Sequence, residues 1–225
     1  MLRADVIQPI LDLFDAPFYL EIGVFDGTTF NAVKAPRKIA VDIKFSCDLE
    51  AARAAVAGQD VHFHECSSDD YFARIVGSEL FDVIFIDGLH TFEQTLRDLL
   101  NAIGHLREGG VIVIDDVIPP SYAASLPSLE ENIAFREARG IKQVDWMGDV
   151  FRLVFFLRDY MPGFSFATLI ENHGETVLWR QPRAVDAAPR SVEQITRLSF
   201  ADCQFSRDAF NIRPFAEIMA LLRGR

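Results

Sequence analysis

Five short apolar runs alternate with helix-like stretches along this chain of 225 residues, and their order sets its fold class. Each run is nearly continuous in apolar character, as expected of parallel strands that are covered on both faces. The runs are Phe18–Val24, Lys38–Ile43, Val61–Cys66, Phe81–Ile86 and Val111–Ile114. The helices predicted between them are Thr28–Lys34, Leu49–Ala57, Asp69–Ile75 and Thr91–Leu106, with Gly109-Gly110 as the stop after the last. This alternation predicts an α/β fold with a mostly parallel sheet, right-handed crossovers and helices on both faces.

The pattern changes after the fifth run, where Ile118-Pro119-Pro120 interrupts regular structure. Residues 117–148 are therefore predicted to be an insertion, with one helix near Leu129–Arg139. A helix over Val150–Tyr160 is predicted next, with Asp149 as its N-cap. Trp146, Asp149 and Arg152 bracket this helix and could face an acceptor molecule. Core packing for Trp146 and a cap for Asp149 are the alternative, and the sequence leaves both interpretations open.

A hairpin is predicted near the end of the sheet. Phe166–Ile170 and Thr176–Arg180 flank Asn172-His173-Gly174-Glu175, in which Asn and Gly suit positive φ. Five parallel strands and one hairpin make a seven-stranded sheet, whereas a dinucleotide-binding fold would continue with parallel units. We expect one domain over residues 1–185 and a helical extension over residues 186–225 that packs on the same domain.

The composition disfavours several classes of partner. The formal net charge is -11 and no cluster of Lys and Arg is present, so a nucleic-acid partner is not expected. No window approaches the roughly 18 uncharged apolar residues of a membrane span, so none is predicted. The three cysteines are far apart and form no C-x-x-C pair, which disfavours disulfides and structural zinc. A reduced, cytoplasmic setting is the expectation.

A glycine turn with the spacing E-x-G-x-x-x-G follows the first run, over Glu21–Gly27. Gly23 allows a sharp backbone turn, and Gly27 allows a helix to start close to a ligand. The dinucleotide pattern G-x-G-x-x-G is absent, so the turn does not indicate a pyrophosphate cradle. S-adenosylmethionine (SAM) has no phosphates and carries an amino acid moiety and a sulfonium cation. The carboxylates Glu21 and Asp26 suit that chemistry.

Two later strand ends extend this predicted cofactor site. Asp42 ends the second run at the place where a carboxylate receives ribose hydroxyls. Ser67 follows the third run, where the adenine edge would lie. The predicted cofactor-binding residues are Glu21, Gly23, Asp26, Gly27, Thr28, Asp42, Ser67 and Asp87. A domain that binds NAD or no nucleotide stays an alternative, since Asp42 could equally hold an NAD ribose.

Three carboxylates end the fourth and fifth runs. Asp87 begins Asp-Gly-Leu-His90, and Asp115 and Asp116 are consecutive. Strand carboxyl ends in such sheets bind ligands, so these groups are expected beside the cofactor. Clustered carboxylates repel one another unless a positive charge lies between them, and Mg²⁺ fits an all-oxygen site. His90 is then a candidate proton acceptor. Capping roles for Asp87, Asp116 and His90 are the alternative.

These motifs together resemble the class I methyltransferases of the macrocin/mycinamicin sugar O-methyltransferase type, also called methyltransferase-24-like. The likeness covers roughly Phe18 to Asp116, and Asp-Gly-x-His followed by paired acids is its most specific part. It implies a Rossmann-like fold, SAM as cofactor, Asp87, Asp115 and Asp116 as Mg²⁺ ligands, and His90 as general base. Asp87 and His90 are thus the expected catalytic residues.

The expected function is therefore O-methylation of a hydroxyl on a small molecule, such as a sugar or a glycosylated metabolite. A metal-independent methyltransferase, an NAD-dependent oxidoreductase or epimerase, and a non-catalytic SAM-binding domain remain alternatives. No motif beyond Val117 identifies the acceptor. The Phe-rich tail, with Phe200, Phe205 and Phe210, either covers the acceptor pocket or forms a homodimer contact.

Overall fold

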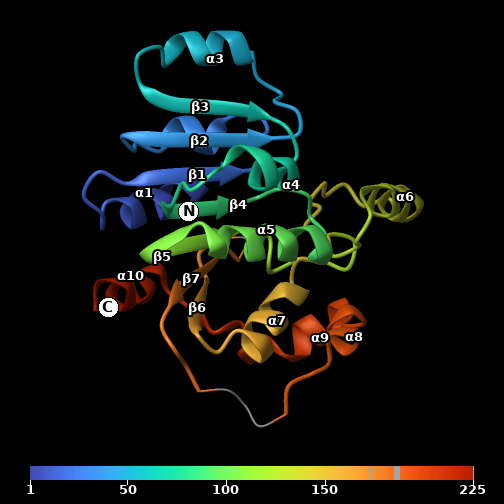
Figure 1. Ribbon diagram of the computed structural model, residues 1–225. Helices are drawn as coiled ribbons and strands as arrows, with labels where there is room; N and C mark the ends of the chain where they lie inside the picture. The colour runs from blue at the N-terminus through green and yellow to red at the C-terminus, as the bar shows by residue number, and fades with distance from the viewer. Residues whose placement is uncertain (173, 185–187, 225) are drawn as a thin grey trace. The chain divides into compact units, whose positions relative to one another are not determined.

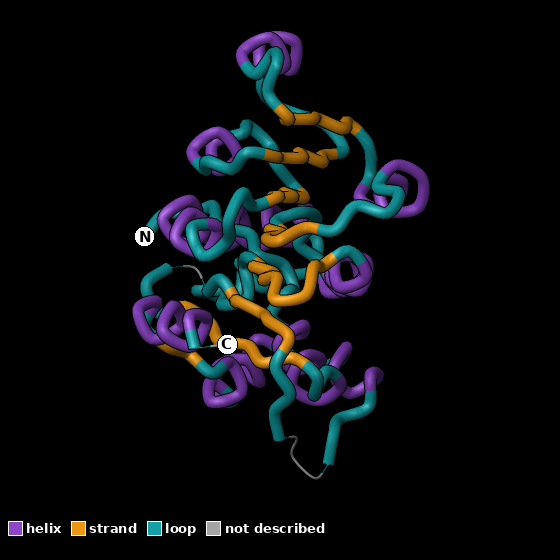
Figure 2. Tube along the Cα trace, turned by 60° about the vertical axis from the view of Figure 1, so that its left-hand side comes forward, coloured by secondary structure: helices purple, strands orange, loops and turns teal. Residues whose placement is uncertain are grey.

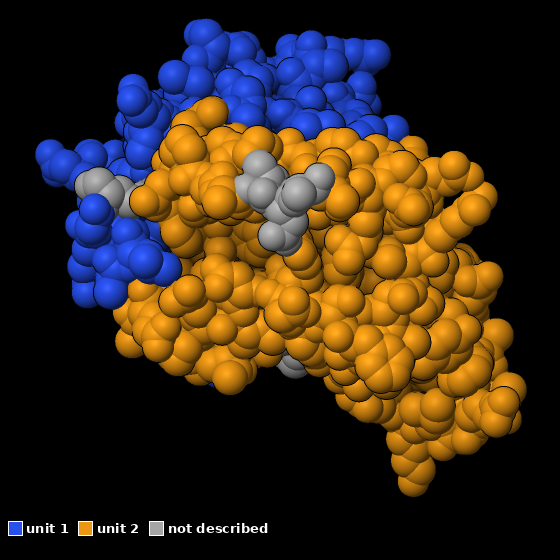
Figure 3. All heavy atoms as spheres, turned by 90° about the horizontal axis from the view of Figure 1, so that it is seen from below, with its two compact units in different colours: residues 1–88, 97–113, 219–225 blue, residues 89–96, 114–218 orange. Residues whose placement is uncertain are grey.

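The computed structural model describes residues 1–172, 174–184 and 188–224, which form two compact units (Figure 3). Unit 1 comprises Met1–Gly88, Arg97–Val113 and Met219–Arg225, and unit 2 comprises Leu89–Leu96 and Ile114–Ile218. The predicted boundary at residues 185 and 186 falls outside the described residues, so the predicted division into a domain and an extension stays a prediction.

The strands of unit 1 follow one another in the order β3-β2-β1-β4-β5 (Figure 1). Their bounds are β1 Phe18–Ile22, β2 Arg37–Asp42, β3 Asp60–Glu65, β4 Phe81–Ile86 and β5 Leu106–Ile114. The pairs β1–β2, β1–β4 and β2–β3 are parallel. Every residue of β1 and of β4 is buried, which explains why these runs are continuous rather than alternating in apolar character. The predicted parallel α/β arrangement is confirmed.

Helices lie on both sides of the unit 1 strands (Figure 2). The helices that start before residue 105 are α1 Arg3–Leu11, α2 Thr28–Ala32, α3 Leu49–Ala55, α4 Ser68–Asp70, the π-helix η1 Tyr71–Ile75 and α5 Phe92–Gly104. The helices that start later are α6 Leu129–Arg139, α7 Arg152–Tyr160, α8 Val192–Thr196, α9 Phe200–Phe205, the 3₁₀ helix η2 Arg207–Phe210 and α10 Phe215–Arg223. None of the described helices is both long enough and apolar enough to cross a membrane.

Helix α1 is an element that the sequence analysis did not predict. It buries Val6, Ile7, Ile10 and Leu11, whose spacing places them on one helical face. At its start, the Asp5 carboxylate accepts a hydrogen bond of 2.9 Å from the Leu2 amide. Pro9 lies inside the helix, a position that usually disfavours proline.

The prediction that Gly109-Gly110 ends a helix was wrong. Helix α5 ends at Gly104, and both glycines lie within β5. Gly109 has φ +77°, and a Cβ on Gly110 would lie 3.0 Å from the Asp82 carbonyl oxygen. Glycine is therefore needed here because β5 passes close to the backbone of Asp82 and Gly109 has a positive φ, and the pair does not end a helix.

Unit 2 contains the strands β7-β6-β8 in that order. Strand β6 (Phe164–Leu169) pairs antiparallel with β7 (Thr176–Arg180), which confirms the hairpin, although His173 in its turn lies outside the described residues. Strand β8, Ile212–Arg213, pairs parallel with β6 and brings the described strands to eight rather than the predicted seven. A strand of two residues has no detectable sequence period, so β8 depends on tertiary contacts. One such contact is next to it: the side-chain amide of Asn211 donates to the Phe166 carbonyl at 2.6 Å.

Candidate functional site

The glycine turn after β1 is shaped by the close passage of another strand end. Gly23 has φ +83°, and a Cβ built on it would lie 2.0 Å from the Asp87 carbonyl oxygen. The Gly23 amide donates to the Val41 carbonyl at 2.9 Å, and the Asp87 amide donates to the Ile22 carbonyl at 2.8 Å. The carboxyl ends of β1, β2 and β4 therefore meet at Gly23, as the motif predicted.

Asp42 holds the turn from the end of β2. Its Oδ2 accepts a hydrogen bond of 2.7 Å from the Phe25 amide, and its Oδ1 accepts one of 2.9 Å from the Lys44 amide. Phe25 has φ +51°, a left-handed conformation that is unfavourable for a non-glycine residue, and its side chain is exposed. Each carboxylate oxygen keeps a second lone pair for a ligand. Asp42 thus lies where a ribose-binding carboxylate was predicted, and it also orders the loop.

Gly27 and Asp26 start the helix that follows the turn. Gly27, with φ +81°, is the N-cap of α2. Asp26 Oδ1 accepts a hydrogen bond of 2.9 Å from the Thr28 amide, and that bond holds the pKa of Asp26 below its ordinary value. Asp26 is exposed, so its carboxylate faces solvent beside the turn.

Glu21 lies inside the core of unit 1, and only 1% of it is exposed. The Tyr19 hydroxyl donates to its Oε2 at 2.7 Å. Burial raises the pKa of Glu21 to about 8, and the nearby Asp87 carboxylate acts in the same direction. Glu21 is thus a largely neutral group beneath the turn near pH 7.

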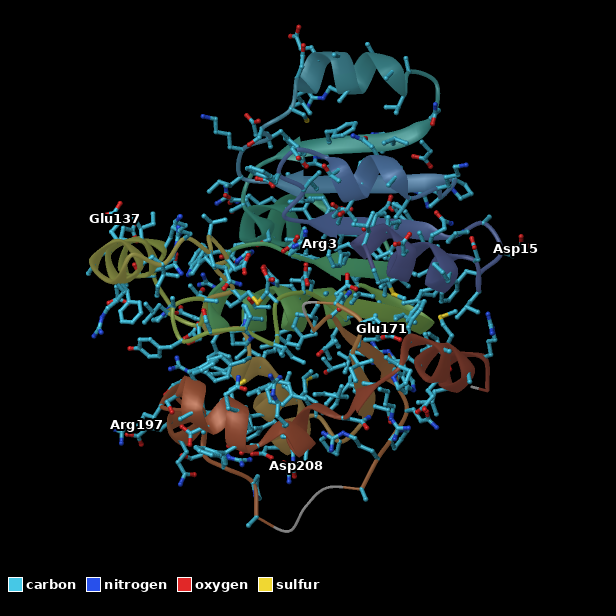
Figure 4. The ribbon with its side chains drawn as sticks, turned by 180° about the vertical axis from the view of Figure 1, so that it is seen from behind. Arg3, Asp15, Glu137, Glu171, Arg197 and Asp208 are labelled. Atoms are coloured by element: carbon cyan, nitrogen blue, oxygen red, sulfur yellow. The ribbon has the colours of Figure 1, made fainter. Side chains whose placement is uncertain are left out.

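Arg3 is a site residue that sequence reasoning missed. Its Nε lies 3.3 Å from Asp87 Oδ2, in an ion pair between the start of α1 and the end of β4. Figure 4 shows Arg3 near the centre of its view. The sequence argument assigned the positive charge beside these carboxylates to a metal, whereas a guanidinium supplies it at Asp87. The apolar period of α1 is the signal that could have found it.

Ser67 is the N-cap of α4. Its hydroxyl accepts a hydrogen bond of 3.1 Å from the Asp70 amide and donates one of 3.0 Å to Asp70 Oδ2. The hydroxyl is thus engaged by the cap, and the predicted contact of Ser67 with adenine stays a prediction.

His90, in unit 2, has a defined tautomer. Its Nδ1 lies 2.8 Å from the carbonyl oxygen of Trp146, which can only accept, so Nδ1 carries the proton. In the neutral ring, Nε2 is therefore the basic nitrogen. It lies 3.1 Å from Asp116 Oδ2. The predicted base and one predicted carboxylate are thus neighbours.

Asp115 and Asp116 are both buried, with exposed fractions of 3% and 5%. Asp115 Oδ1 accepts a hydrogen bond of 2.8 Å from the Asp116 amide. Asp116 has φ +63°, which is uncommon outside glycine and directs the chain sharply after β5. The Asp116 carboxylate thus lies beside the imidazole of His90, whereas Asp115 holds the Asp116 amide.

The prediction that Asp149 caps the helix after the insertion was wrong. Helix α7 has Phe151 as its N-cap, without a side-chain capping bond. Asp149 Oδ1 instead accepts a hydrogen bond of 2.6 Å from the Phe92 amide, which starts α5. Asp149 also forms an ion pair with Arg152. It therefore orders the segment that carries His90, 57 residues earlier in the sequence.

A family model described as a methyltransferase domain, Methyltransf_24, matches residues 20–117 of this chain. The match covers the glycine turn and all four residues predicted to carry the chemistry: Asp87, His90, Asp115 and Asp116. A comparison with curated proteins found no match.

Solved structures share the fold. The SAH-bound methyltransferase PaMTH1 of Podospora anserina is 18% identical with a TM-score of 0.56, and each chain covers 80% of the other. An O-methyltransferase of Bacillus cereus in complex with SAH is 18% identical with a TM-score of 0.53, over 78% of this chain and 79% of that chain. TomG of Streptomyces achromogenes, an O-methyltransferase involved in tomaymycin synthesis and solved with SAM, is 17% identical with a TM-score of 0.51, over 80% and 79%.

The Rossmann-like methyltransferase fold predicted from the sequence is thus confirmed. The match of residues 20–117 to a methyltransferase domain supports the enzyme class that the sequence predicted, a methyltransferase. None of these three solved proteins is described as a sugar methyltransferase.

Proposed function

We propose that this chain is a SAM-dependent O-methyltransferase that acts on a hydroxyl of a small molecule, with His90 as general base. The observation that carries the proposal is the geometry of His90. A backbone carbonyl fixes the proton on Nδ1, and a carboxylate lies 3.1 Å from the basic Nε2. The O-methyltransferases among the solved structures with this fold support the choice of a hydroxyl acceptor.

The proposed SAM site is the turn of unit 1. SAM supplies the methyl group as an electrophile on its sulfonium. Gly23 and Gly27 give the turn its shape, since both have positive φ and Gly23 lets the Asp87 backbone pass close by. Asp42 accepts the ribose hydroxyls, Asp26 attracts the positive groups, and Thr28 lies at the start of α2. Glu21, Ser67 and Asp87 complete the proposed set.

The proton of the acceptor hydroxyl passes to Nε2 of His90. The oxygen then forms its bond to the methyl carbon as the carbon–sulfur bond breaks, and S-adenosylhomocysteine leaves with the electron pair of that bond. Asp116, close to Nε2, stabilises the positive charge that His90 acquires. General-base catalysis of this kind contributes on the order of 10²–10⁴ in rate.

The proposed reaction is assisted by Mg²⁺, with Asp87, Asp115 and Asp116 as the proposed ligands. Asp116 fits a hard cation as a buried carboxylate whose ligand oxygen lies within 4.8 Å of a ring nitrogen of His90, and Asp115 is not among the described residues of that group. At Asp87, the ion pair with Arg3 competes with a cation for the same carboxylate. When bound, Mg²⁺ would lower the pKa of the acceptor hydroxyl and orient it.

A metal-independent methyltransferase is favoured by one observation and stays the second candidate. The Nε2 of His90 and the Oδ2 of Asp116 are close enough to share a proton directly, without a metal between them. In that case, the pair alone removes the hydroxyl proton and stabilises the resulting imidazolium.

Two measurements test the proposal. Calorimetry should show binding of SAM and S-adenosylhomocysteine and no binding of NAD; tight NAD binding alone would overturn the cofactor assignment. Methyl transfer from labelled SAM to a panel of sugars, glycosides and phenols should then be lost in His90→Gln. The same assay after complete metal removal with EDTA decides between the two candidates, since unchanged turnover excludes the metal.

A further inference from the structure

We propose that Trp146, at the end of the insertion, is a positioning residue for His90 and sets the tautomer on which proton removal depends. The inference rests on the proposed function, because His90 matters as a base only if the chain transfers a methyl group to a hydroxyl. The contacts themselves lie within unit 2 and do not depend on that assignment.

Trp146 contacts His90 in two ways. Its carbonyl oxygen accepts the hydrogen bond from Nδ1 at 2.8 Å. Its indole stacks on the imidazole, with ring centroids 5.1 Å apart and an interplanar angle of 29°. The first contact selects the nitrogen that holds the proton, and the second fixes the plane of the ring. Together they leave Nε2 directed at Asp116.

The insertion holds Trp146 in place. The indole Nε1–H donates to the Leu126 carbonyl at 2.8 Å, and the Met147 amide donates to the Ala124 carbonyl at 2.9 Å. The wholly buried Asn132 of α6 ties both ends of the insertion together, since its amide donates to the Ala123 and Asp145 carbonyls at 2.7 and 3.2 Å. The fold of the insertion therefore determines where the indole lies.

Gly148, the residue after Met147, lies against the backbone of His90. Gly148 has φ +58°, and a Cβ on it would lie 1.5 Å from the carbonyl oxygen of His90. Only glycine allows the two backbones to come so close. The segment from Trp146 to Asp149 thus contacts the ring and backbone of His90 and the amide of Phe92.

The sequence analysis left Trp146 between an acceptor contact and simple packing, and a packing role makes a different prediction. A residue that only fills space would change stability when truncated, without changing which nitrogen of His90 is protonated. A positioning residue changes the tautomer and the turnover number while SAM affinity stays the same, because neither Trp146 nor His90 is among the residues proposed to bind the cofactor.

The experiment compares Trp146→Ala and Trp146→Phe with the wild type. The phenyl ring of Trp146→Phe keeps the stack and loses the bond to Leu126, whereas Trp146→Ala loses both. Trp179→Phe is the matched control, since Trp179 is an indole of unit 2 with its own hydrogen bond, to Gln181 at 2.8 Å, and is buried whereas Trp146 is partly buried. The readouts are ¹⁵N NMR of the ring nitrogens, turnover with SAM and an acceptor, and S-adenosylhomocysteine affinity. His90→Gln assigns the His90 signals among the five histidines.

The wild type should show His90 protonated at Nδ1 when neutral. Trp146→Ala keeps the backbone carbonyl but removes the stack and the Leu126 bond that hold the imidazole and this segment in place. The ring of His90 can then rotate away from the carbonyl, so a mixture of tautomers should appear and kcat should fall by about 10- to 100-fold, as for a misplaced catalytic group. S-adenosylhomocysteine affinity should stay unchanged, and both Phe variants should resemble the wild type. Equal tautomers and equal kcat in a folded Trp146→Ala would overturn the inference. If NMR shows the expected change but no acceptor is methylated by the wild type, the positioning contact stands and the proposed function fails.

Discussion

Replacement of Gly23 by alanine should damage the cofactor turn for two separable reasons. Alanine at φ +83° adopts a left-handed conformation, which costs about 1–2 kcal/mol. Its Cβ would also lie 2.0 Å from the Asp87 carbonyl oxygen, a backbone atom that moves only if β4 moves, and such overpacking costs about 1–3 kcal/mol. We therefore expect Gly23→Ala to lower the free energy of unfolding by about 2–5 kcal/mol, since the two costs of strain and overpacking add.

Gly58→Ala isolates the first cost, because Gly58 has φ +84° and nothing lies within 4 Å of its Cβ position. Urea denaturation should show a loss of only about 1–2 kcal/mol for Gly58→Ala, the strain cost alone. Calorimetry should show unchanged S-adenosylhomocysteine affinity in Gly58→Ala and at least about a tenfold loss in Gly23→Ala, or about 1.4 kcal/mol. Equal stability losses and equal affinities in the two variants would refute the role assigned to the close approach of Asp87.

Three further predictions concern the neighbouring carboxylates. Asp42→Asn should weaken S-adenosylhomocysteine binding by about tenfold in calorimetry, because an amide cannot accept from the Phe25 amide and the ribose on both sides. Since burial raises the pKa of Glu21 from 4.5 to about 8, the folded chain keeps a proton that the unfolded chain releases, so wild-type stability should fall as the pH rises from about 5 to 8; Glu21→Gln should remove that slope from the denaturation midpoints. Asp149→Ala should lower the free energy of unfolding by about 1–2 kcal/mol, because the Phe92 amide at the start of α5 loses its hydrogen-bond acceptor. Urea denaturation measures this, and a loss below about 0.5 kcal/mol would contradict the capping role.

The strands of unit 1 could be predicted because their apolar character is local. The bounds predicted for β4 and β7 agree with the structure: Asp87 and Gly88 follow Phe81–Ile86, and Glu175 and Gln181 flank Thr176–Arg180. Strand β8 could not be predicted, because its two residues pair with β6 only through contacts 44 or more residues apart in sequence. Strands of five or more apolar residues can thus be predicted from the local sequence, whereas a two-residue strand such as β8 forms only through tertiary packing.

The candidate site divides in the same way. Asp42 and the glycines were predictable because strand ends and turns have sequence signatures. The pairing of Arg3 with Asp87 was not predictable, since no motif joins the two residues, although the apolar spacing of α1 indicates the helix that carries Arg3. The Trp146 carbonyl was also beyond prediction, because a backbone atom carries no signature in side-chain identity.

The bond between Asp149 and the Phe92 amide also bears on the order in which the protein is made. A ribosome adds roughly 5–20 residues per second, so the 57 residues between the two take about 3–11 s to synthesise. During that interval, Trp146 and Asp149 are not yet available to hold the loop that carries His90. The amino-terminal strands can thus associate before the proton acceptor acquires its geometry, and a nascent chain released early would carry a complete glycine turn and an unordered His90.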